Sequence, residues 1–327
     1  MCGNMKICLI GPGIMPIPPE NWGAVESLIW DQYEYLKNIG IDVDIINTKN
    51  LYDVANQVNN TDYDFIHLQY DDHAGTLSQL LKKPFCTTTH YGYIKEYYPT
   101  YPGWRYVFDG VKTSPGLISL SKDIEDLFKR DGYSGFSRVL RNGARFKDFK
   151  FNNNGNGTAI CLGKIESRKR QAHISNFSAN KCKIDFIGPN IDPTFKENQT
   201  CHYKGIWSKN ILYNSLTEYS SLILLSDGEA APLVVPEALC AGLSIVVTET
   251  ASANLNKSFP FIHVLPQNYS IDEAIAAINL ANAENKKYRN EIREYAKEYF
   301  DWDVVCREYL DIIKDFAYEN SVHNNSN

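Results

Sequence analysis

The sequence has 327 residues, which is enough for two domains of ordinary size. Hydrophobic residues make up 43% of it and charged residues 22%, the composition of a globular protein. The formal net charge of -6 argues against a nucleic-acid partner, because contact with a phosphate backbone needs a basic surface.

The N-terminal residues predict a buried strand and not a targeting segment. The apolar run before Gly11 is too short for a signal peptide or for a membrane span. The 8 cysteines form no C-x-x-C pair, so we expect reduced thiols. These features predict a cytoplasmic protein without a transmembrane segment.

Short apolar runs alternate with amphipathic stretches along the first half of the chain. We predict a strand at residues 6–10, a helix at 24–39 that ends at Gly40, and further strands at 41–47, 65–69, 85–89 and 116–119. Strands separated by helices pair in parallel, so this half predicts a doubly wound α/β domain.

A polar, Asn- and Gly-rich connector at residues 150–158 precedes a second series of the same kind. Here we predict strands at 159–162, 183–187, 222–225 and 243–247, and helices at 271–283 and 286–300. The expected domains are 1–148, with a returning helix at 303–318, and 149–302. Residues 319–327 are expected to form a disordered tail.

Ligands bind such sheets at the carboxyl ends of the strands, and four loops there carry candidate residues. The first, at residues 11–26, contains Gly13 and Gly23 and leads into a helix. It is either a phosphate-contacting loop or a stiff surface loop, and three prolines exclude the G-x-G-x-x-G fingerprint.

The second loop follows the strand at 222–225 and carries two carboxylates, Glu229 and Glu237. Glu237 is predicted in the first turn of a short helix that Gly242 closes. Carboxylates suit the binding of vicinal hydroxyls, and backbone N–H groups of the turn suit a diphosphate. The structural alternative for Glu237 is a helix-capping role.

The third loop, at residues 163–170, clusters cations after the first strand of the second domain, which suits a diphosphate leaving group. The alternative is a solvated basic turn. The fourth loop carries His90, which could donate to a phosphate or to a sugar hydroxyl, although a lone histidine is more often structural.

Taken together, these motifs resemble the family-4 glycosyltransferases of the GT-B fold, over nearly the whole chain. The E-x7-E motif of that family is matched by Glu229 and Glu237, and its basic pair falls on Lys164 and Lys169, with lysine in place of the usual arginine. Its first-loop glycine aligns with Gly23 and its donor-site histidine with His90.

The resemblance implies two Rossmann-like domains that face a central cleft, with a C-terminal helix packed back on the first. It also implies a retaining glycosyltransferase that takes a hexose from a nucleotide diphosphate sugar without a cofactor or a metal. Glu229 would contact the transferred sugar and Glu237 the donor ribose. The implied catalytic residues are Glu229, His90 and Lys169, and the implied donor-binding residues are Gly13, Gly23, Gly163, Lys164, Lys169, Ser226, Ala231, Pro232, Leu233, Val234 and Glu237.

By family frequency the expected donor is UDP-glucose, with GDP-mannose second. The acceptor, a glycan, a lipid-linked group or a small molecule, stays open, and so does peripheral contact with a membrane. An aromatic segment is a candidate for the acceptor site, because aromatic faces stack on sugar rings; core packing is the alternative for each ring. The aromatic segment comprises Tyr91, Tyr93, Tyr97, Tyr98, Tyr101, Trp104, Tyr106 and Phe108.

Two other functions stay open: a non-catalytic nucleotide-sugar-binding subunit, and a nucleotide-sugar 2-epimerase of the same fold.

Overall fold

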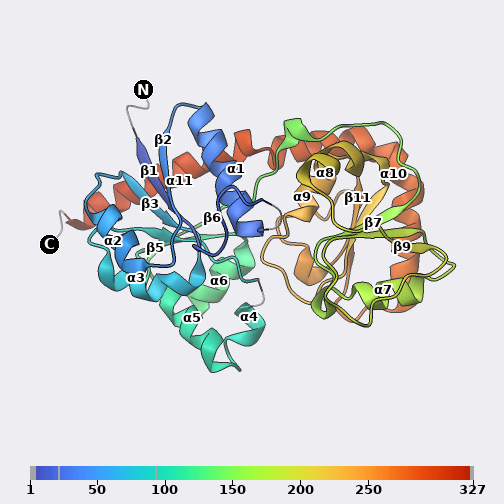
Figure 1. Cartoon of the computed structure of the whole chain (residues 1–327), viewed down its shortest axis with the longest axis horizontal. Coiled ribbons are helices and arrows are strands. Elements are labelled where there is room, and N and C mark those ends of the chain that lie inside the picture. The colour runs from blue at the N-terminus through green and yellow to red at the C-terminus, as the bar shows by residue number, and fades with distance from the viewer. Residues whose placement is uncertain (1–4, 21–22, 93, 325–327) are drawn as a thin grey trace. The chain divides into compact units, whose positions relative to one another are not determined.

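The structure is a computed structural model that describes residues 5–20, 23–92 and 94–324. The chain divides into two compact units (Figure 1). Unit 1 contains residues 1–142 and 302–327, and unit 2 contains residues 143–301. Unit 1 ends at residue 142, six residues before the expected end at 148. The chain returns to unit 1 at residue 302, one residue before the expected 303.

Unit 1 is built on a six-stranded parallel sheet in the order β2-β1-β3-β4-β5-β6. The predicted strands at 6–10 and 116–119 are confirmed with those bounds, and the others are shorter than predicted. The strands are β1 (Lys6–Ile10), β2 (Asp42–Ile46), β3 (Phe65–Leu68), β4 (Cys86–Thr87), β5 (Gly116–Ser119) and β6 (Phe136–Val139).

Helices follow the strands of unit 1 in the βαβ manner. The first ends as predicted, because Gly40 takes a φ of 86°, which side chains disfavour, and its N–H donates to the carbonyl of Lys37 at 3.0 Å. The helices are α1 (Ala24–Asn38), α2 (Leu51–Asn59), α3 (Ala74–Leu80), α4 (Ile94–Tyr97), α5 (Pro102–Lys112), α6 (Lys122–Arg130) and α11 (Trp302–Asn324).

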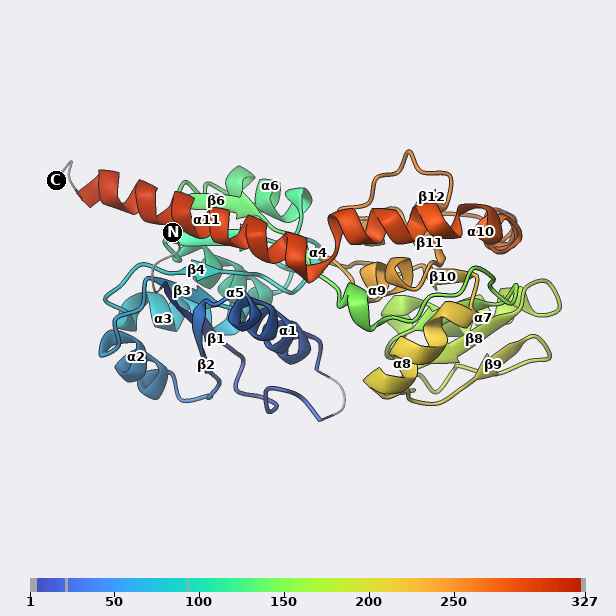
Figure 2. The same cartoon turned by 90° about the horizontal axis from the view of Figure 1, so that it is seen from above.

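The C-terminal helix α11 packs on unit 1, as the sequence predicted (Figure 2). Arg141 binds Glu308 of this helix through both terminal guanidinium nitrogens, at 2.6 and 2.9 Å. Tyr309 is buried against β3, with its hydroxyl 3.0 Å from Nδ1 of His67. The helix continues to Asn324, so residues 319–324 are helical and the expected disordered tail is wrong for them.

Unit 2 contains a second six-stranded parallel sheet, in the order β12-β11-β10-β7-β8-β9. Two of its strands, β9 and β12, were not predicted from the sequence; they are three and four residues long. The strands are β7 (Ala159–Leu162), β8 (Ile184–Ile187), β9 (Cys201–Tyr203), β10 (Ser221–Leu224), β11 (Ser244–Thr248) and β12 (Ile262–Leu265); the helices are α7 (Gln171–Ser178), α8 (Lys209–Ser215), α9 (Val234–Cys240) and α10 (Ile271–Tyr299).

The prediction of two helices at 271–283 and 286–300 is wrong, because α10 is one helix of 29 residues. Its first half packs into the core shared with α7, and its second half into the core shared with α9. Asn285, midway, donates to the carbonyl of Gly242 at 2.9 Å at the start of β11. The helix therefore crosses the amino-terminal edge of the sheet, and its polar middle is buried there.

In each sheet the strand order reverses at one place, and the loops that follow the strands there can open a ligand-binding crevice. In unit 1 the reversal lies between β1 and β3, and in unit 2 it lies between β7 and β10. The candidate loops at 11–26, 163–170 and 226–229 all leave strands that border a reversal point.

Candidate functional site

The loops after β7 and β10 form one connected site in unit 2. The backbone N–H of Asp227 donates to the carbonyl of Arg168 at 2.9 Å, which joins the two loops directly. Arg170 also forms an ion pair with Asp227. The structure thus brings the basic stretch at 163–170 against the loop that carries Glu229.

Arg168 is the centre of this connection. Its guanidinium donates to Glu229 at 3.1 Å, to Glu166 at 2.9 Å and to the hydroxyl of Ser226 at 3.1 Å, and it also binds the carbonyl of Gly228. The side chain of Glu229 is only 14% exposed. The carboxylate is therefore held in one place by a half-buried arginine before any ligand binds.

Lys169 is a half-buried cation in the same loop. Gly163 has a φ of 124°, and a Cβ built on it would lie 3.0 Å from Nζ of Lys169, so the glycine leaves room for the ammonium group. Within the described part of the chain, no carboxylate forms an ion pair with Lys169. Lys164 differs, since its side chain is 50% exposed and lies 3.5 Å from Glu166.

Glu237 lies in the first turn of α9, as predicted, and its side chain is 13% exposed. Its carboxylate accepts a hydrogen bond of 2.8 Å from Nζ of Lys209, the first residue of α8. The helix begins at Val234. The remaining predicted donor-binding residues here, Ala231, Pro232, Leu233 and Val234, are partly exposed beside it.

We predict that Arg168→Met destabilises unit 2 by about 1–3 kcal/mol, because it leaves Glu229, Glu166 and the carbonyl of Gly228 without their common donor. The melting temperature should fall by several degrees in differential scanning calorimetry. Lys164→Met is the matched control, and we expect it to change stability by less than about 0.5 kcal/mol, because its ion pair is half exposed. Equal melting of the two variants would contradict this role of Arg168.

In unit 1 the two predicted glycines are held by their own chain. The N–H of Gly13 donates to Oδ1 of Asn47 at 2.7 Å, and a Cβ at Gly13 would lie 2.4 Å from the backbone nitrogen of Lys49. Gly23 precedes α1, and its carbonyl accepts the N–H of Ser27 at 2.8 Å. Asn21 and Trp22 of this motif lie outside the described residues.

His90 is half-buried in the loop after β4, and two residues that follow β3 hold it. Its Nε2 lies 3.0 Å from Oε1 of Gln69, and its backbone N–H donates to Oδ2 of Asp71 at 2.9 Å. Thr89 also binds Asp71 through its hydroxyl. Burial lowers the pKa of His90 from 6.5 to about 4, so the ring is neutral at pH 7.

The aromatic segment of unit 1 packs largely on itself. Tyr91 meets Trp104 edge to face at 5.0 Å between ring centroids, and Tyr98 stacks on Phe108 at 4.1 Å. Tyr106 is 72% exposed, and Tyr93 lies outside the described residues. Core packing, the alternative from the sequence, thus holds for Tyr91, Tyr98, Trp104 and Phe108.

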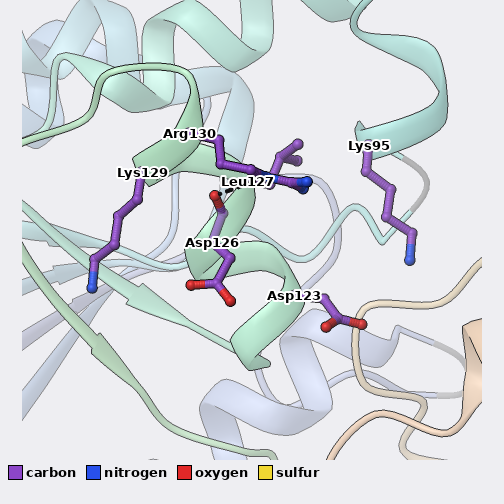
Figure 3. A pocket seen from close by; sticks show the side chains of 6 residues that line it. All are labelled: Lys95, Asp123, Asp126, Leu127, Lys129 and Arg130. Atoms are coloured by element: carbon purple, nitrogen blue, oxygen red, sulfur yellow. Dashed lines mark hydrogen bonds between the residues drawn. The ribbon is translucent and has the colours of Figure 1, made fainter.

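A hollow of about 600 Å³ lies in unit 1 beside α6. Lys95 of α4 and Arg130 of α6 border it, with Asp123 below them (Figure 3). The other two charged side chains of the lining, Asp126 and Lys129, form ion pairs within α6. None of the site residues predicted from the sequence lines this hollow.

The described residues were compared with what a membrane-crossing helix and a metal site require. Only α10 and α11 have the length of a membrane-crossing helix, and both carry too many charged residues to be one. No three side chains of His, Cys, Asp or Glu gather in the described ranges as they would to hold a metal ion.

Four residues that hold the predicted ones were not themselves predicted: Arg168, Lys209, Gln69 and Asp71. Arg168 stands in the basic stretch that was recognised, but the sequence does not show which of its cations reaches Glu229. Lys209 follows Ser208, whose hydroxyl accepts the N–H of Ile211 as a helix N-cap. Gln69 is the last residue of a predicted strand and Asp71 comes two residues later, and that position was the signal available for them.

No protein-family model matches this sequence, and no curated protein matches it by sequence similarity. The structure, however, matches solved structures over almost its whole length. AviGT4, a glycosyltransferase involved in avilamycin A biosynthesis, aligns with a TM-score of 0.71 at 12% identity, covering 96% of this chain and 98% of AviGT4. Sucrose-phosphate synthase from Thermosynechococcus elongatus aligns with a TM-score of 0.75 at 14% identity, covering 95% and 99%.

HepE of Anabaena, solved in complex with UDP and glucose, aligns with a TM-score of 0.73 at 12% identity, covering 95% of this chain and 100% of HepE. These likenesses and the two parallel sheets define the fold. The chain has the α/β GT-B fold, with two Rossmann-like units and a C-terminal helix that returns to the first, as the sequence predicted.

Proposed function

We propose that this protein is a retaining glycosyltransferase that transfers a hexose from a nucleotide diphosphate sugar to a hydroxyl acceptor without a metal. The observation that carries the proposal is Lys169, a half-buried cation with no carboxylate partner among the described residues. A half-buried cation is stabilised by a counter-charge, and a diphosphate at the strand reversal point between β7 and β10 would supply one.

The residues around Lys169 fit the other parts of such a donor. Glu229 is held by Arg168 at 3.1 Å and provides carboxylate oxygens for the hydroxyls of the transferred sugar. Glu237 is proposed to bind the ribose hydroxyls. The wall of the site would be formed by Gly163, Ser226 and residues 231–234 of unit 2.

In this reaction the bond between the anomeric carbon and the donor phosphate oxygen breaks, and negative charge grows on the departing diphosphate. Lys169 and Lys164 offset that charge, which stabilises the transition state more than the ground state. The leaving phosphate itself takes the proton of the acceptor hydroxyl, so no protein base is required.

The donor is proposed to be UDP-glucose, with GDP-mannose second. HepE was solved with UDP-glucose, and a trehalose-6-phosphate enzyme of E. coli that aligns with a TM-score of 0.68 was solved with UDP-2-fluoro glucose. The acceptor is a glycan, a lipid-linked group or a small molecule. We place the protein in the cytoplasm, where nucleotide sugars are made, with peripheral membrane contact if the acceptor is a lipid.

We predict that UDP or GDP raises the melting temperature of the purified protein by several degrees. A ligand at 100 times its Kd that binds only the folded state stabilises it by about 2.7 kcal/mol. Uridine and guanosine, which lack the diphosphate, are the controls and should shift the melting temperature much less. If none of UDP, GDP, UDP-glucose and GDP-mannose shifts the melting temperature, the proposed donor class is wrong.

The two alternatives from the sequence are separated by the products. A glycosyltransferase releases the sugar from the nucleotide, slowly to water when no acceptor is present, with the anomeric configuration retained in the NMR spectrum. A 2-epimerase would instead invert the configuration at C2 of the sugar. A non-catalytic binding subunit would show the thermal shift and no product.

A further inference from the structure

The side chains around His90 form a directional hydrogen-bond network in the interior of unit 1. It joins four elements: Gln32 on α1, His67 on β3, Gln69 just after β3 and Tyr309 on α11. All four side chains are at most 2% exposed. A network this well buried has little freedom to change its donors and acceptors, because a lost hydrogen bond cannot be replaced by water.

The direction of the network can be followed from Tyr309. Its hydroxyl lies 3.0 Å from Nδ1 of His67, whose Nε2 lies 2.7 Å from the hydroxyl of Thr88. A tyrosine hydroxyl carries one proton, which it can donate to Nδ1 of His67. Burial lowers the pKa of His67 to about 3, so this ring is neutral and can accept it.

The same direction orients Gln69. Oε1 of Gln32 accepts from Nε2 of Gln69 at 2.7 Å, and that Nε2 also lies 3.4 Å from Nδ1 of His67. Both neighbours on this side are acceptors, so the amide nitrogen of Gln69 points to them and its oxygen points to His90. A carbonyl oxygen only accepts, and hence Nε2 of His90, 3.0 Å away, must carry the proton.

We propose that Gln69, oriented by Gln32, fixes His90 in the tautomer protonated at Nε2, so that Nδ1 is left free to accept a hydrogen bond from a ligand hydroxyl at the loop after β4. This inference rests on the proposed function. Among the hydrogen bonds of the described residues, none uses Nδ1 of His90. His90 therefore accepts from a ligand hydroxyl instead of donating to a phosphate, and Gln69 is a positioning residue.

Asp71 completes the arrangement by holding the backbone. It accepts the N–H of His90 at 2.9 Å and binds the hydroxyl of Thr89, so the loop after β4 is tied to the segment after β3. The titratable groups around the ring are His67 on β3, Tyr309 on α11, and Asp71, Asp72 and His73 in the turn after β3. Burial keeps His67 and His73 neutral near pH 7, since it lowers the pKa of each.

The test is the tautomer itself, measured by NMR on the full chain labelled with ¹⁵N-histidine. The His90→Asn spectrum identifies the His90 signals among those of the 7 histidines. We expect the wild-type ring to be protonated at Nε2 with a free Nδ1, and Gln69→Leu to give both neutral tautomers in exchange. A wild-type ring protonated at Nδ1, or a Gln69→Leu ring still held in the Nε2–H form, would overturn the proposal.

Activity gives a second readout. Gln69→Leu should lower kcat/KM for nucleotide-sugar hydrolysis by about tenfold, because His90 then spends part of its time in the wrong form. The thermal shift by UDP should persist in this variant. Gln69→Glu should raise the pKa of His90 from about 4 toward neutrality and move the acidic limb of the pH–rate profile upward by the same amount.

Gln57→Leu is the matched control, since Gln57 is an exposed residue on α2, and it should change neither the tautomer nor the rate. The tautomer measurement needs no substrate. If no nucleotide binds, the proposed function fails while the NMR result still tests Gln69. If nucleotides bind and the tautomer is wrong, only the inference about His90 fails.

Discussion

Glu229→Ala and Lys169→Ala are each expected to abolish the hydrolysis of the nucleotide sugar by the purified protein. Removing one group that stabilises a transition-state charge typically costs a factor of about 10²–10³ in kcat, which brings a slow hydrolysis below detection. The rate is measured as nucleotide release from UDP-glucose or GDP-mannose, whichever gives the larger thermal shift. Wild-type turnover in both variants would show that the site assignment is wrong.

The two variants should differ in binding, because they are proposed to act on different parts of the donor. Lys169→Ala should lose most of the thermal shift given by UDP, since the cation facing the diphosphate is gone. Glu229→Gln, which keeps the size of the side chain beside Arg168, should keep the shift given by UDP and lose the extra shift given by the sugar. The reverse pattern would exchange the two roles.

Matched controls come from the surface of the same unit. Glu294 and Lys297 lie on α10 with side chains 64% and 57% exposed, and they form an ion pair of 3.8 Å. Glu294→Ala and Lys297→Ala remove the same functional groups far along the chain from the candidate loops. Both should retain wild-type turnover and melting temperature within error.

Arg289→Met is expected to produce the largest loss of stability, about 4 kcal/mol or more. Arg289 is 1% exposed, and its guanidinium binds the carbonyls of Asn152, Tyr219, Thr217 and Ala241 and the side chain of Asn285. Its removal leaves several buried carbonyl oxygens without a donor, and each costs about 1–3 kcal/mol.

The measurement is the free energy of unfolding from denaturant titration, with the melting temperature falling by roughly 10 °C. Burial lowers the pKa of Arg289 to about 10, so the side chain is still charged at pH 7 and offers all its donors. Arg289→Lys should recover little stability, because an ammonium group cannot span these carbonyls as the planar guanidinium does. Lys286→Met, at an exposed position on the same helix, is the control, and an equal effect there would refute this role of Arg289.

The course of α10 shows where sequence patterns reach their limit. Glu284 and Asn285 lie between the two predicted helices, where a polar interruption of the apolar periodicity predicts a break. In the structure Asn285 and Arg289 face inward and bind carbonyls at the amino-terminal edge of the sheet. The polar residues in the middle of α10 therefore make buried contacts. Their partners precede strands that are 40 or more residues away along the chain. The strand β9 was not predicted because its three residues are too few to show a pattern.

The sequence by itself determined the alternation of strands and helices, the doubly wound α/β domains and the loops that carry the candidate residues. These follow from local spacing, since apolar periodicity and glycine positions act within a few residues. Only the tertiary structure decided that Arg168 holds Glu229, that Lys209 meets Glu237 and that Gln69 faces His90. Each of these contacts joins loops or helices that follow different strands, and partners across a sheet are chosen by the strand order, which no local pattern encodes.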